Sequence, residues 1–332
     1  MMQLNMTSER SAPLYRARFW AAYWMTMRPY LLFVSGAAGL VGLSFVGGSS
    51  TMRIALALIP LFFSYGLGQA LTDCFQTDTD ALSSPYRPLV RGIVSKKQVV
   101  VVSLSGLLLS LAILMRLNFA MLVPGVLAVI GLLTYTLLKR TWWGGPPWNS
   151  WIVALLPIMG RLSDPNSRFV SLFDAHDSLA RPFIYAVAAV FFGYANFVVM
   201  GYFKDISADR KTGYETFPVV FGWIPSAIYS DITALAAALS VGAFMAVLET
   251  THLIAVVVFA AAIAINGYAQ WKIHRTRKES ESHGPIGNVV RAFVLYCLAM
   301  IVACKPQWWA FLIVYYALFE LTLRQRPERS QI

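Results

Sequence analysis

The stretch TDCFQTDTDALSSPYRPL, residues 72–89, decides how this chain folds, because it is a charged interruption between two long apolar runs. It carries three aspartates, one glutamine and one arginine. The apolar run before it covers residues 54–72 and the run after it covers 98–115. Each run is long enough to cross a bilayer as a helix. The stretch therefore predicts a polar loop at one end of membrane-spanning helices.

The composition extends this interpretation to the whole chain. Of 332 residues, 58% are hydrophobic and 13% charged, and the mean hydropathy is +0.60, unlike a soluble globular protein. Apolar runs recur at 29–47, 54–72, 98–115, 118–138, 149–163, 181–203, 222–248, 251–270, 288–304 and 306–323. We expect an all-α polytopic membrane helical bundle of about nine to ten transmembrane helices, with a central cavity opening to the cytoplasmic side and to lipid. The runs 149–163 and 288–304 are short, so nine spans plus a re-entrant piece remain an alternative.

Lysine and arginine predict the orientation, because cytoplasmic loops carry the excess of positive charge. With the N-terminus inside, the inner segments hold 20 Lys and Arg, the outer segments hold 6, and Arg291 lies within a run. We therefore expect an integral membrane protein, of a bacterial inner (plasma) membrane, with both termini and the acidic loops in the cytoplasm. Residues 1–332 form a single domain in this interpretation, with a cytoplasmic segment 1–27 and a cytoplasmic tail 324–332.

The net charge of +11 belongs mostly to this inner face. It indicates contact with anionic membrane lipid and no nucleic-acid partner. Residues 1–27 show no removable signal peptide, so we expect the first helix to act as its own signal. The three cysteines have no paired spacing, which argues against a disulfide framework or a zinc site. Asp174, His176 and Asp177 in one outer loop are a candidate metal cluster, with an ordinary solvated loop as the alternative.

A second acidic loop, YFKDISADRKTG at 202–213, gives the clearest chemistry. Asp205 and Asp209 are four residues apart and would share one face of a helix that continues from the run 181–203. Two like charges repel there, and a divalent cation would reverse the sign of that interaction. Magnesium binds one or two carboxylates together with substrate phosphates, so the pair predicts a diphosphate held through Mg2+. Lys204, Arg210 and Lys211 would contact the phosphates directly.

The first loop repeats this arrangement. If its helix is regular, Thr72, Gln76 and Asp80 fall on one stripe with Asp73 beside it. Asp78 then points elsewhere, although it could join the site where the helix ends. Arg87 precedes Pro88 in a rigid turn, where a guanidinium can bind phosphate oxygens. Acidic residues near helix ends are often only solvated, but two acidic pairs on the same side, each followed by cations, favour a site.

At these two loops the sequence resembles the UbiA superfamily of intramembrane prenyltransferases, and most of all its chlorophyll synthase-like branch. That branch has a first motif N-D-x-x-D-x-x-x-D followed by A-I-N-E-P-Y-R-P, beside which TDCFQTDTD and ALSSPYRP align without a gap. The second family motif, K-D-x-x-x-D-R-x-x-G then T-L-P-V-x-x-G, is matched by KDISADRKTG and TFPVVFG. MRPYLLF at 27–33 and Asn149 are further similarities. The resemblance covers most of the chain, and its specificity rests on the two aspartate motifs.

The resemblance implies roles for individual residues. Asp73, Asp80, Asp205 and Asp209 match positions that bind Mg2+-diphosphate in the family, and Arg87 and Lys204 match its diphosphate-binding cations. Thr72 stands where the family has asparagine, and Gln76 stands where it has the central aspartate. A neutral carboxamide binds Mg2+ more weakly than a carboxylate, so the number of bound ions is open, and Asp78 is a candidate replacement ligand.

The implied activity is Mg2+-dependent transfer of a prenyl group from an isoprenoid diphosphate to a lipophilic acceptor. The allylic cation needs an aromatic lining that excludes water, for which the candidates are Tyr65, Phe75, Tyr194, Tyr202 and Phe203. Asp231 is a candidate base for the acceptor because it lies within a predicted span. Asn149, Asn196 and Glu320 are weaker candidates of the same kind.

Two other functions fit parts of the pattern. A terpene cyclase on the same scaffold would use the substrate's own double bond as nucleophile, and the altered first motif favours it. A cation or lipid transporter would also carry membrane carboxylates. Transporter sites lie near the bilayer midplane, however, whereas these acids lie at helix ends.

Overall fold

The computed structural model describes residues 11–48, 50–174, 176–248 and 252–325, and its described part is entirely helical. The α-helices are α1 (Ala17–Thr26), α2 (Pro29–Ser44), α3 (Thr51–Asp73), α4 (Thr77–Ser83), α5 (Lys96–Leu117), α6 (Leu122–Lys139), α7 (Gly145–Arg161), α8 (Ala180–Tyr202), α9 (Ile206–Lys211), α10 (Phe217–Phe221), α11 (Trp223–Val247), α12 (Leu253–Arg275), α13 (His283–Cys304) and α14 (Trp309–Arg324). Four 3-10 turns join them: η1 (Phe119–Met121), η2 (Val170–Phe173), η3 (Glu279–Glu281) and η4 (Pro306–Trp308).

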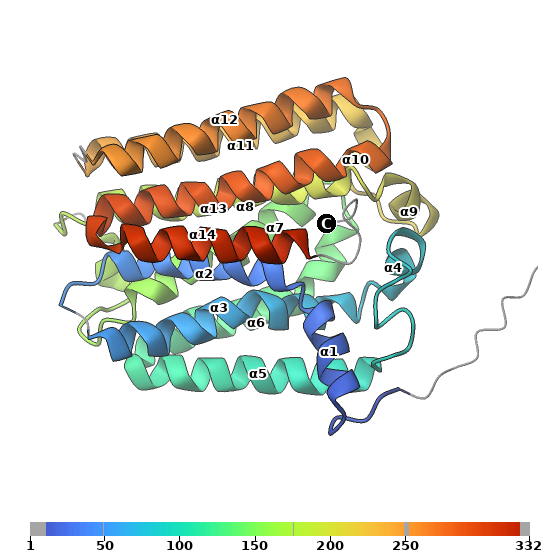
Figure 1. Ribbon diagram of the computed structural model, residues 1–332, viewed down its shortest axis with the longest axis horizontal. Helices are drawn as coiled ribbons and strands as arrows, with labels where there is room; N and C mark the ends of the chain where they lie inside the picture. Colours follow the sequence, from blue (N-terminus) through green and yellow to red (C-terminus); the bar gives the residue numbers. More distant parts are fainter. Residues whose placement is uncertain (1–10, 49, 175, 249–251, 326–332) are drawn as a thin grey trace, which may run out of the picture.

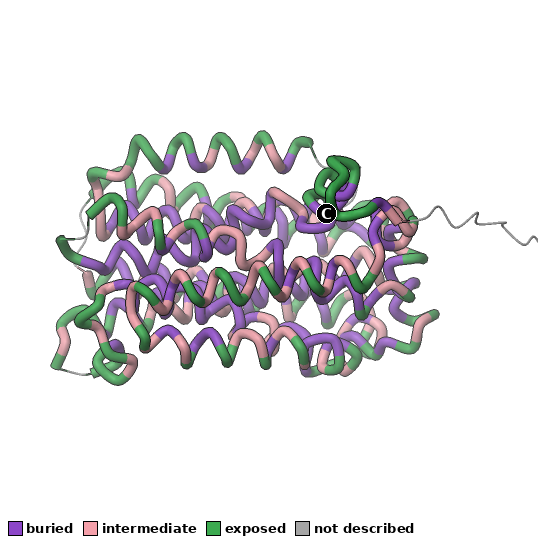
Figure 2. Tube along the Cα trace, turned by 90° about the horizontal axis from the view of Figure 1, so that it is seen from below, coloured by how far each residue is buried: buried purple, intermediate pink, exposed green. Residues whose placement is uncertain are grey.

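The long helices lie alongside one another, and the short helices α1, α4, α9 and α10 gather at one end of the bundle (Figure 1). Buried residues run through the middle of the molecule, while exposed residues follow its outer helices (Figure 2). Many exposed side chains on these outer helices are large and apolar, including Leu137, Leu235 and Leu239. An apolar exterior around a packed interior is what a bilayer requires.

The number of full-length spans is smaller than expected. Among the described residues, seven helical segments are long and apolar enough to cross a membrane, and the bent pair α1 and α2 would make an eighth. Every predicted apolar run forms a helix, but those at 149–163 and 306–323 form α7 and α14, of only 17 and 16 residues. Helices of that length rise about 25 Å, less than the hydrocarbon core. By length and composition, seven or eight segments among the described residues therefore qualify as candidate spans, against the nine to ten expected. Parts of the predicted segment 1–27 and tail 324–332 lie outside the described residues.

Glycines allow the central helices to approach closely. A Cβ atom on Gly42 of α2 would lie 1.9 Å from the carbonyl oxygen of Pro157, and one on Gly160 of α7 would lie 2.3 Å from that of Gly39. Close backbone contact through small residues is a main source of helix association in membranes. The packing of α2 on α7 brings the ends of both helices toward the acidic loops.

Both acidic loops break their helices. α3 ends at Asp73 and α4 starts at Thr77, while α8 ends at Tyr202 and α9 starts at Ile206. The predicted continuous helices through these loops are therefore wrong, and in each loop a short separate helix follows the long one. The two short helices meet, because the hydroxyl oxygens of Thr79 and Thr212 lie 3.0 Å apart in a hydrogen bond. This confirms that the two loops face each other.

Candidate active site

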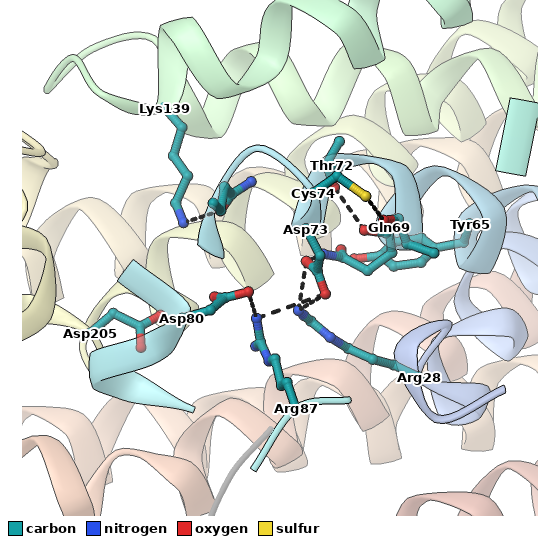
Figure 3. Close-up of polar contacts among 12 residues, drawn as sticks. Arg28, Tyr65, Gln69, Thr72, Asp73, Cys74, Asp80, Arg87, Lys139 and Asp205 are labelled. Atoms are coloured by element: carbon teal, nitrogen blue, oxygen red, sulfur yellow. Dashed lines mark hydrogen bonds and ion pairs between the residues drawn. The ribbon is translucent and has the colours of Figure 1, made fainter. Parts of the chain in front are cut away.

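Asp73 and Asp80 share cations that come from distant parts of the chain (Figure 3). The Arg28 guanidinium lies 3.0 Å from the Asp73 carboxylate, and Arg87 lies 2.5 Å from Asp80 and 3.8 Å from Asp73. Gln69, one turn before Asp73, donates a 2.6 Å hydrogen bond to it. Arg87 thus links the end of α3 to α4, as its position before Pro88 in a turn allows.

Arg28 has a strained backbone. It lies between α1 and α2, which meet at a 59° bend, and its φ of 54° is the only positive value at a described residue other than glycine. Pro29 disfavours the helical conformation for the residue before it, and a left-handed residue of this kind costs about 1–3 kcal/mol. At this bend the Arg28 guanidinium makes its ion pair with Asp73.

Lys139, at the end of α6, is a site residue that the sequence analysis did not select. Its side chain is buried, and its Nζ donates a 2.6 Å hydrogen bond to the Oε1 atom of Gln76. Arg28 was missed in the same way, although the motif MRPYLLF contains it. The only signal for Lys139 was its place at a helix end, which it shares with many lysines of membrane proteins.

The second acidic loop carries Asp205 just before α9 and Asp209 within it. Lys204 Nζ lies 3.2 Å from the Asp205 carboxylate. Asp209 is fully buried; its Oδ2 accepts a 3.1 Å hydrogen bond from Thr216, and its Oδ1 has no hydrogen-bond partner. A buried carboxylate oxygen without a partner is costly, so Oδ1 of Asp209 is a candidate ligand for a cation.

Burial and neighbouring charge act differently on these acids. Burial raises the pKa of Asp209 to about 6, with Lys139 opposing the rise. Burial also raises the pKa of Asp80, against the effect of Arg87. For Asp205, burial acts upward, but Lys204, Lys139 and Arg87 together hold its pKa below the ordinary value. The effect of burial on the pKa therefore outweighs that of the neighbouring cations at Asp80 and Asp209, whereas the cations outweigh burial at Asp205.

A polar cavity lies between the two loops. Its lining includes Asp80, Asp205 and Gln76, the cations Arg28, Arg87, Lys139 and Lys204, and the aromatic residues Tyr30, Tyr65, Tyr135, Tyr194 and Tyr202. A second, apolar cavity between α3, α5, α6 and α7 adjoins it. Tyr65, Gln69, Tyr135, Asn149 and Tyr194 line both cavities. At this junction the hydroxyl groups of Tyr65 and Tyr194 are 2.6 Å apart.

Some predicted site residues lie elsewhere. Thr72 bonds the backbone of Gln69 and lines only the apolar cavity. Asp78 is half exposed and faces Arg140 at 3.6 Å, so the break after α3 does not bring it into the cavity. Arg210 and Lys211 are exposed and do not line the polar cavity. These three charged residues are therefore absent from the lining of the polar cavity.

Asp231 also lies outside the cavity. It pairs with His274 of α12 at 2.7 Å, and both side chains are more than a third exposed. Of the other candidates, Glu320 pairs with Arg291, Asn196 bonds Ser230, and Phe75 is exposed. Phe203 packs on Trp223, with ring centres 4.6 Å apart. In the outer loop, Asp177 pairs with Arg161. Among the described residues, no three His, Cys, Asp or Glu side chains are grouped closely enough to hold a metal ion by themselves.

The fold and the two joined cavities define a class: an intramembrane protein whose site suits an amphipathic molecule with an anionic head. Residues 31–286 match the UbiA prenyltransferase family. The chain is 26% identical over 197 residues to a digeranylgeranylglyceryl phosphate synthase of Natronomonas pharaonis, covering 59% of this chain and 67% of that one. It is 26% identical over 198 residues to the bacteriochlorophyll synthase 33 kDa chain of Rhodobacter capsulatus, covering 58% and 63%.

The fold is also that of solved structures. A UbiA homolog from Archaeoglobus fulgidus bound to GPP and Mg2+ superposes with a TM-score of 0.62 and 19% identity, covering 84% of this chain and 99% of that one. The chain belongs to the UbiA prenyltransferase family and is an integral membrane prenyltransferase. This confirms the resemblance found at the two aspartate motifs.

Proposed function

We propose that this chain transfers a prenyl group from an isoprenoid diphosphate to a lipophilic acceptor, with Mg2+ bound between the acidic loops. The carrying observation is the junction at Tyr65, Tyr135 and Tyr194, which line both the polar cavity and the adjoining apolar one. A prenyl diphosphate has the same division into a charged head and a hydrocarbon tail, and its reactive allylic carbon lies where the two meet.

The head would be held by cations from four parts of the chain. Arg87 and Arg28 approach from the side of the first loop, and Lys204 and Lys139 from the side of the second and of α6. All four line the polar cavity, and guanidinium groups suit the paired oxygens of phosphate. As negative charge moves onto the departing diphosphate, these fixed cations stabilise it more strongly than they stabilise the bound substrate.

The carboxylates fit a magnesium ion. Asp80 and Asp73 on one side and Asp205 and Asp209 on the other would hold it, and the unpartnered oxygen of Asp209 is the clearest open ligand. Two carboxylates are enough to bind Mg2+, because protein sites typically supply this ion with one or two carboxylates and leave its other coordination positions to phosphates and water. The chemistry that bound Mg2+ supplies is neutralisation of the leaving diphosphate. The homolog with GPP and Mg2+ supports this assignment.

The tail would lie in the apolar cavity, whose walls include Leu104, Leu111, Ile152 and Leu156. This lining excludes water from the allylic cation. The rings of Tyr65, Tyr135 and Tyr194 offer π-faces near the site of charge, as cation stabilisation requires. Asn149, on α7, also lies at the junction and is placed to contact the substrate.

The orientation follows from the same arrangement. We propose that the end bearing α4 and α9 faces the cytoplasm, in keeping with the excess of Lys and Arg on the segments predicted to be inside. The whole chain would then act as a single domain in a bacterial inner membrane, with the diphosphate bound near the water and the tail toward the bilayer.

Purified protein incubated with geranyl, farnesyl or geranylgeranyl diphosphate and Mg2+ tests the proposal. A lipid extract of the host membrane serves as acceptor source, and both pyrophosphate and prenylated lipid are measured. We expect pyrophosphate and prenylated lipid in equal amounts, and neither with EDTA. The matched pair of variants is Asp209→Asn, which should be inactive, and Asp231→Asn, which lies outside the cavity and should be active.

Three results would contradict the proposal. Cyclic hydrocarbon formed without any lipid extract would identify a terpene cyclase. Pyrophosphate release that persists in Asp209→Asn would move the site elsewhere. Full activity in EDTA would remove the metal from the mechanism.

A further inference from the structure

A second polar pocket lies beyond the active-site cavity, between α4, α9 and η3 at the same end of the bundle. Its lining includes Ser83, Lys204, Asp205, Ser207, Lys211 and Glu279. Lys204 and Asp205 also line the polar cavity. Their 3.2 Å ion pair is therefore the partition between the two spaces.

The outer side of this pocket reaches water. Ser207 and Lys211 are exposed residues of α9. Glu279 of η3 closes over them: its Oε1 accepts a 2.9 Å hydrogen bond from the backbone N–H of Ser207, and its Oε2 accepts a 2.8 Å hydrogen bond from the Ser207 hydroxyl. We call this pair of hydrogen bonds the Ser207–Glu279 strap.

We propose that the pyrophosphate product leaves the active site through this pocket, past the Lys204–Asp205 pair and out under the Ser207–Glu279 strap. This inference rests on the proposed function, which supplies the pyrophosphate. A multiply charged anion cannot leave through lipid, because its transfer to an apolar phase is prohibitively unfavourable. The apolar cavity between α3, α5, α6 and α7 is excluded as an exit for the same reason.

The charges along the path change from strong attraction for an anion inside the protein to weak attraction at the surface. Lys204 is nearly buried, so its attraction for an anion is strong, whereas Lys211 is exposed and its attraction is weakened by water and salt. Glu279 places a negative charge at the mouth of the pocket. An anion that reaches Lys211 is thus bound weakly, and the Glu279 carboxylate opposes its passage for as long as the strap is closed.

The same contacts could serve only to fasten α9 to η3. These two roles differ in what they do to the rate at which bound pyrophosphate escapes. A fastening role leaves that rate independent of the strap, whereas an exit role makes it depend on whether the strap can open.

Covalent closure of the strap is the first test. The double variant Ser207→Cys/Glu279→Cys is loaded with 32P-pyrophosphate and Mg2+, then bridged with a short bismaleimide, and dissociation is followed by rapid filtration. We expect dissociation at least about tenfold slower than in the unbridged double variant. The two single cysteine variants, treated alike, control for reaction at Cys74, Cys297 and Cys304. Equal rates in bridged and unbridged protein would overturn the proposal.

Opening of the strap is the second test. Glu279→Ala removes both hydrogen bonds and the carboxylate, and we expect it to release pyrophosphate faster than the wild-type protein. Its matched control is Glu281→Ala on the same turn, since Glu281 does not line the pocket and pairs with Lys278. An unchanged rate of pyrophosphate release in Glu279→Ala would contradict an exit route under the Ser207–Glu279 strap.

Failure of the proposed function would show itself differently. In that case the unbridged protein would not bind pyrophosphate, or geranyl diphosphate would not displace it. An intact, competitive binding site with a release rate indifferent to the strap would refute the exit and leave the proposed function standing.

Discussion

The carboxamide oxygen of Gln76 accepts a 2.6 Å hydrogen bond from the ammonium group of Lys139, and both side chains are buried. The two residues are 63 positions apart, one at the start of α4 and one at the end of α6. A neutral acceptor orients the ammonium group without cancelling its charge. Lys139 therefore remains available to an anion in the polar cavity, where a carboxylate at position 76 would have paired with it.

The substitution Gln76→Asp should strengthen the binding of Mg2+ and weaken the binding of the prenyl diphosphate. The new carboxylate adds a metal ligand and pairs with Lys139, so we expect half-maximal activity at about tenfold lower Mg2+ and a higher KM for the prenyl diphosphate. Titration of Mg2+ and of geranylgeranyl diphosphate measures the two effects. Gln76→Asn shortens the side chain in the same way without adding charge and should not increase the affinity for Mg2+. Identical Mg2+ curves for the two variants would contradict the role assigned to Gln76.

Arg87 should matter for stability as well as for binding, because it is the cation closest to Asp80. In Arg87→Ala the buried Asp80 loses its partner, and breaking a buried pair in this way costs about 3–5 kcal/mol. We expect a lower unfolding temperature in detergent and loss of prenyl transfer. Arg140→Ala removes the exposed partner of Asp78 and should cost at most about 1 kcal/mol. Equal unfolding temperatures for the two variants would show that the buried Arg87–Asp80 ion pair stabilises the protein no more than the exposed Arg140–Asp78 pair does.

The aspartate motifs could be recognised from sequence because their residues are close in the chain and of a type that is rare in membrane helices. Asp73, Asp80, Asp205 and Asp209 all lie in the two facing loops, as predicted. The cations that complete the cavity could not be found in this way. Lys139 comes from the end of α6, which packs on α7, and Arg28 comes from the bend between α1 and α2, so only the tertiary structure brings them to the site.

The positions of Arg210 and Lys211 could not be predicted from the sequence of their own loop. A regular helix through residues 72–80 or 202–213 fixes which side chains share a face, but each loop contains a break of three residues. Glycine and proline, the usual sequence signals of such a break, are absent from positions 74–76 and 203–205. The breaks arise from tertiary contacts, among them the hydrogen bond between Thr79 and Thr212.

Binding of Mg2+ should release a proton near pH 6. Burial raises the pKa of Asp209 to about 6 in the metal-free protein, so the carboxyl group is partly protonated there and must ionise to bind the metal. Affinity for Mg2+ should therefore fall as the pH drops through 6 and level off above about 7. Calorimetry in buffers of different ionisation enthalpy measures the protons released. Asp209→Asn should abolish the component of release centred near pH 6, and its persistence in that variant would assign it to another group.

The length of the accepted prenyl chain should depend on the far end of the apolar cavity. Ala128 lines that cavity on α6, 11 residues before Lys139 and so about 16 Å along the helix from it. A phenyl ring at this position would fill space that the end of a long chain needs and that a chain half as long does not reach. We expect Ala128→Phe to lower kcat/KM for geranylgeranyl diphosphate at least about tenfold while leaving geranyl diphosphate unaffected. Val126→Phe is the matched control, because Val126 is exposed on the same helix and does not line the cavity. Equal loss with both substrates would indicate damage to folding, and no loss with either would place the tail in another part of the bundle.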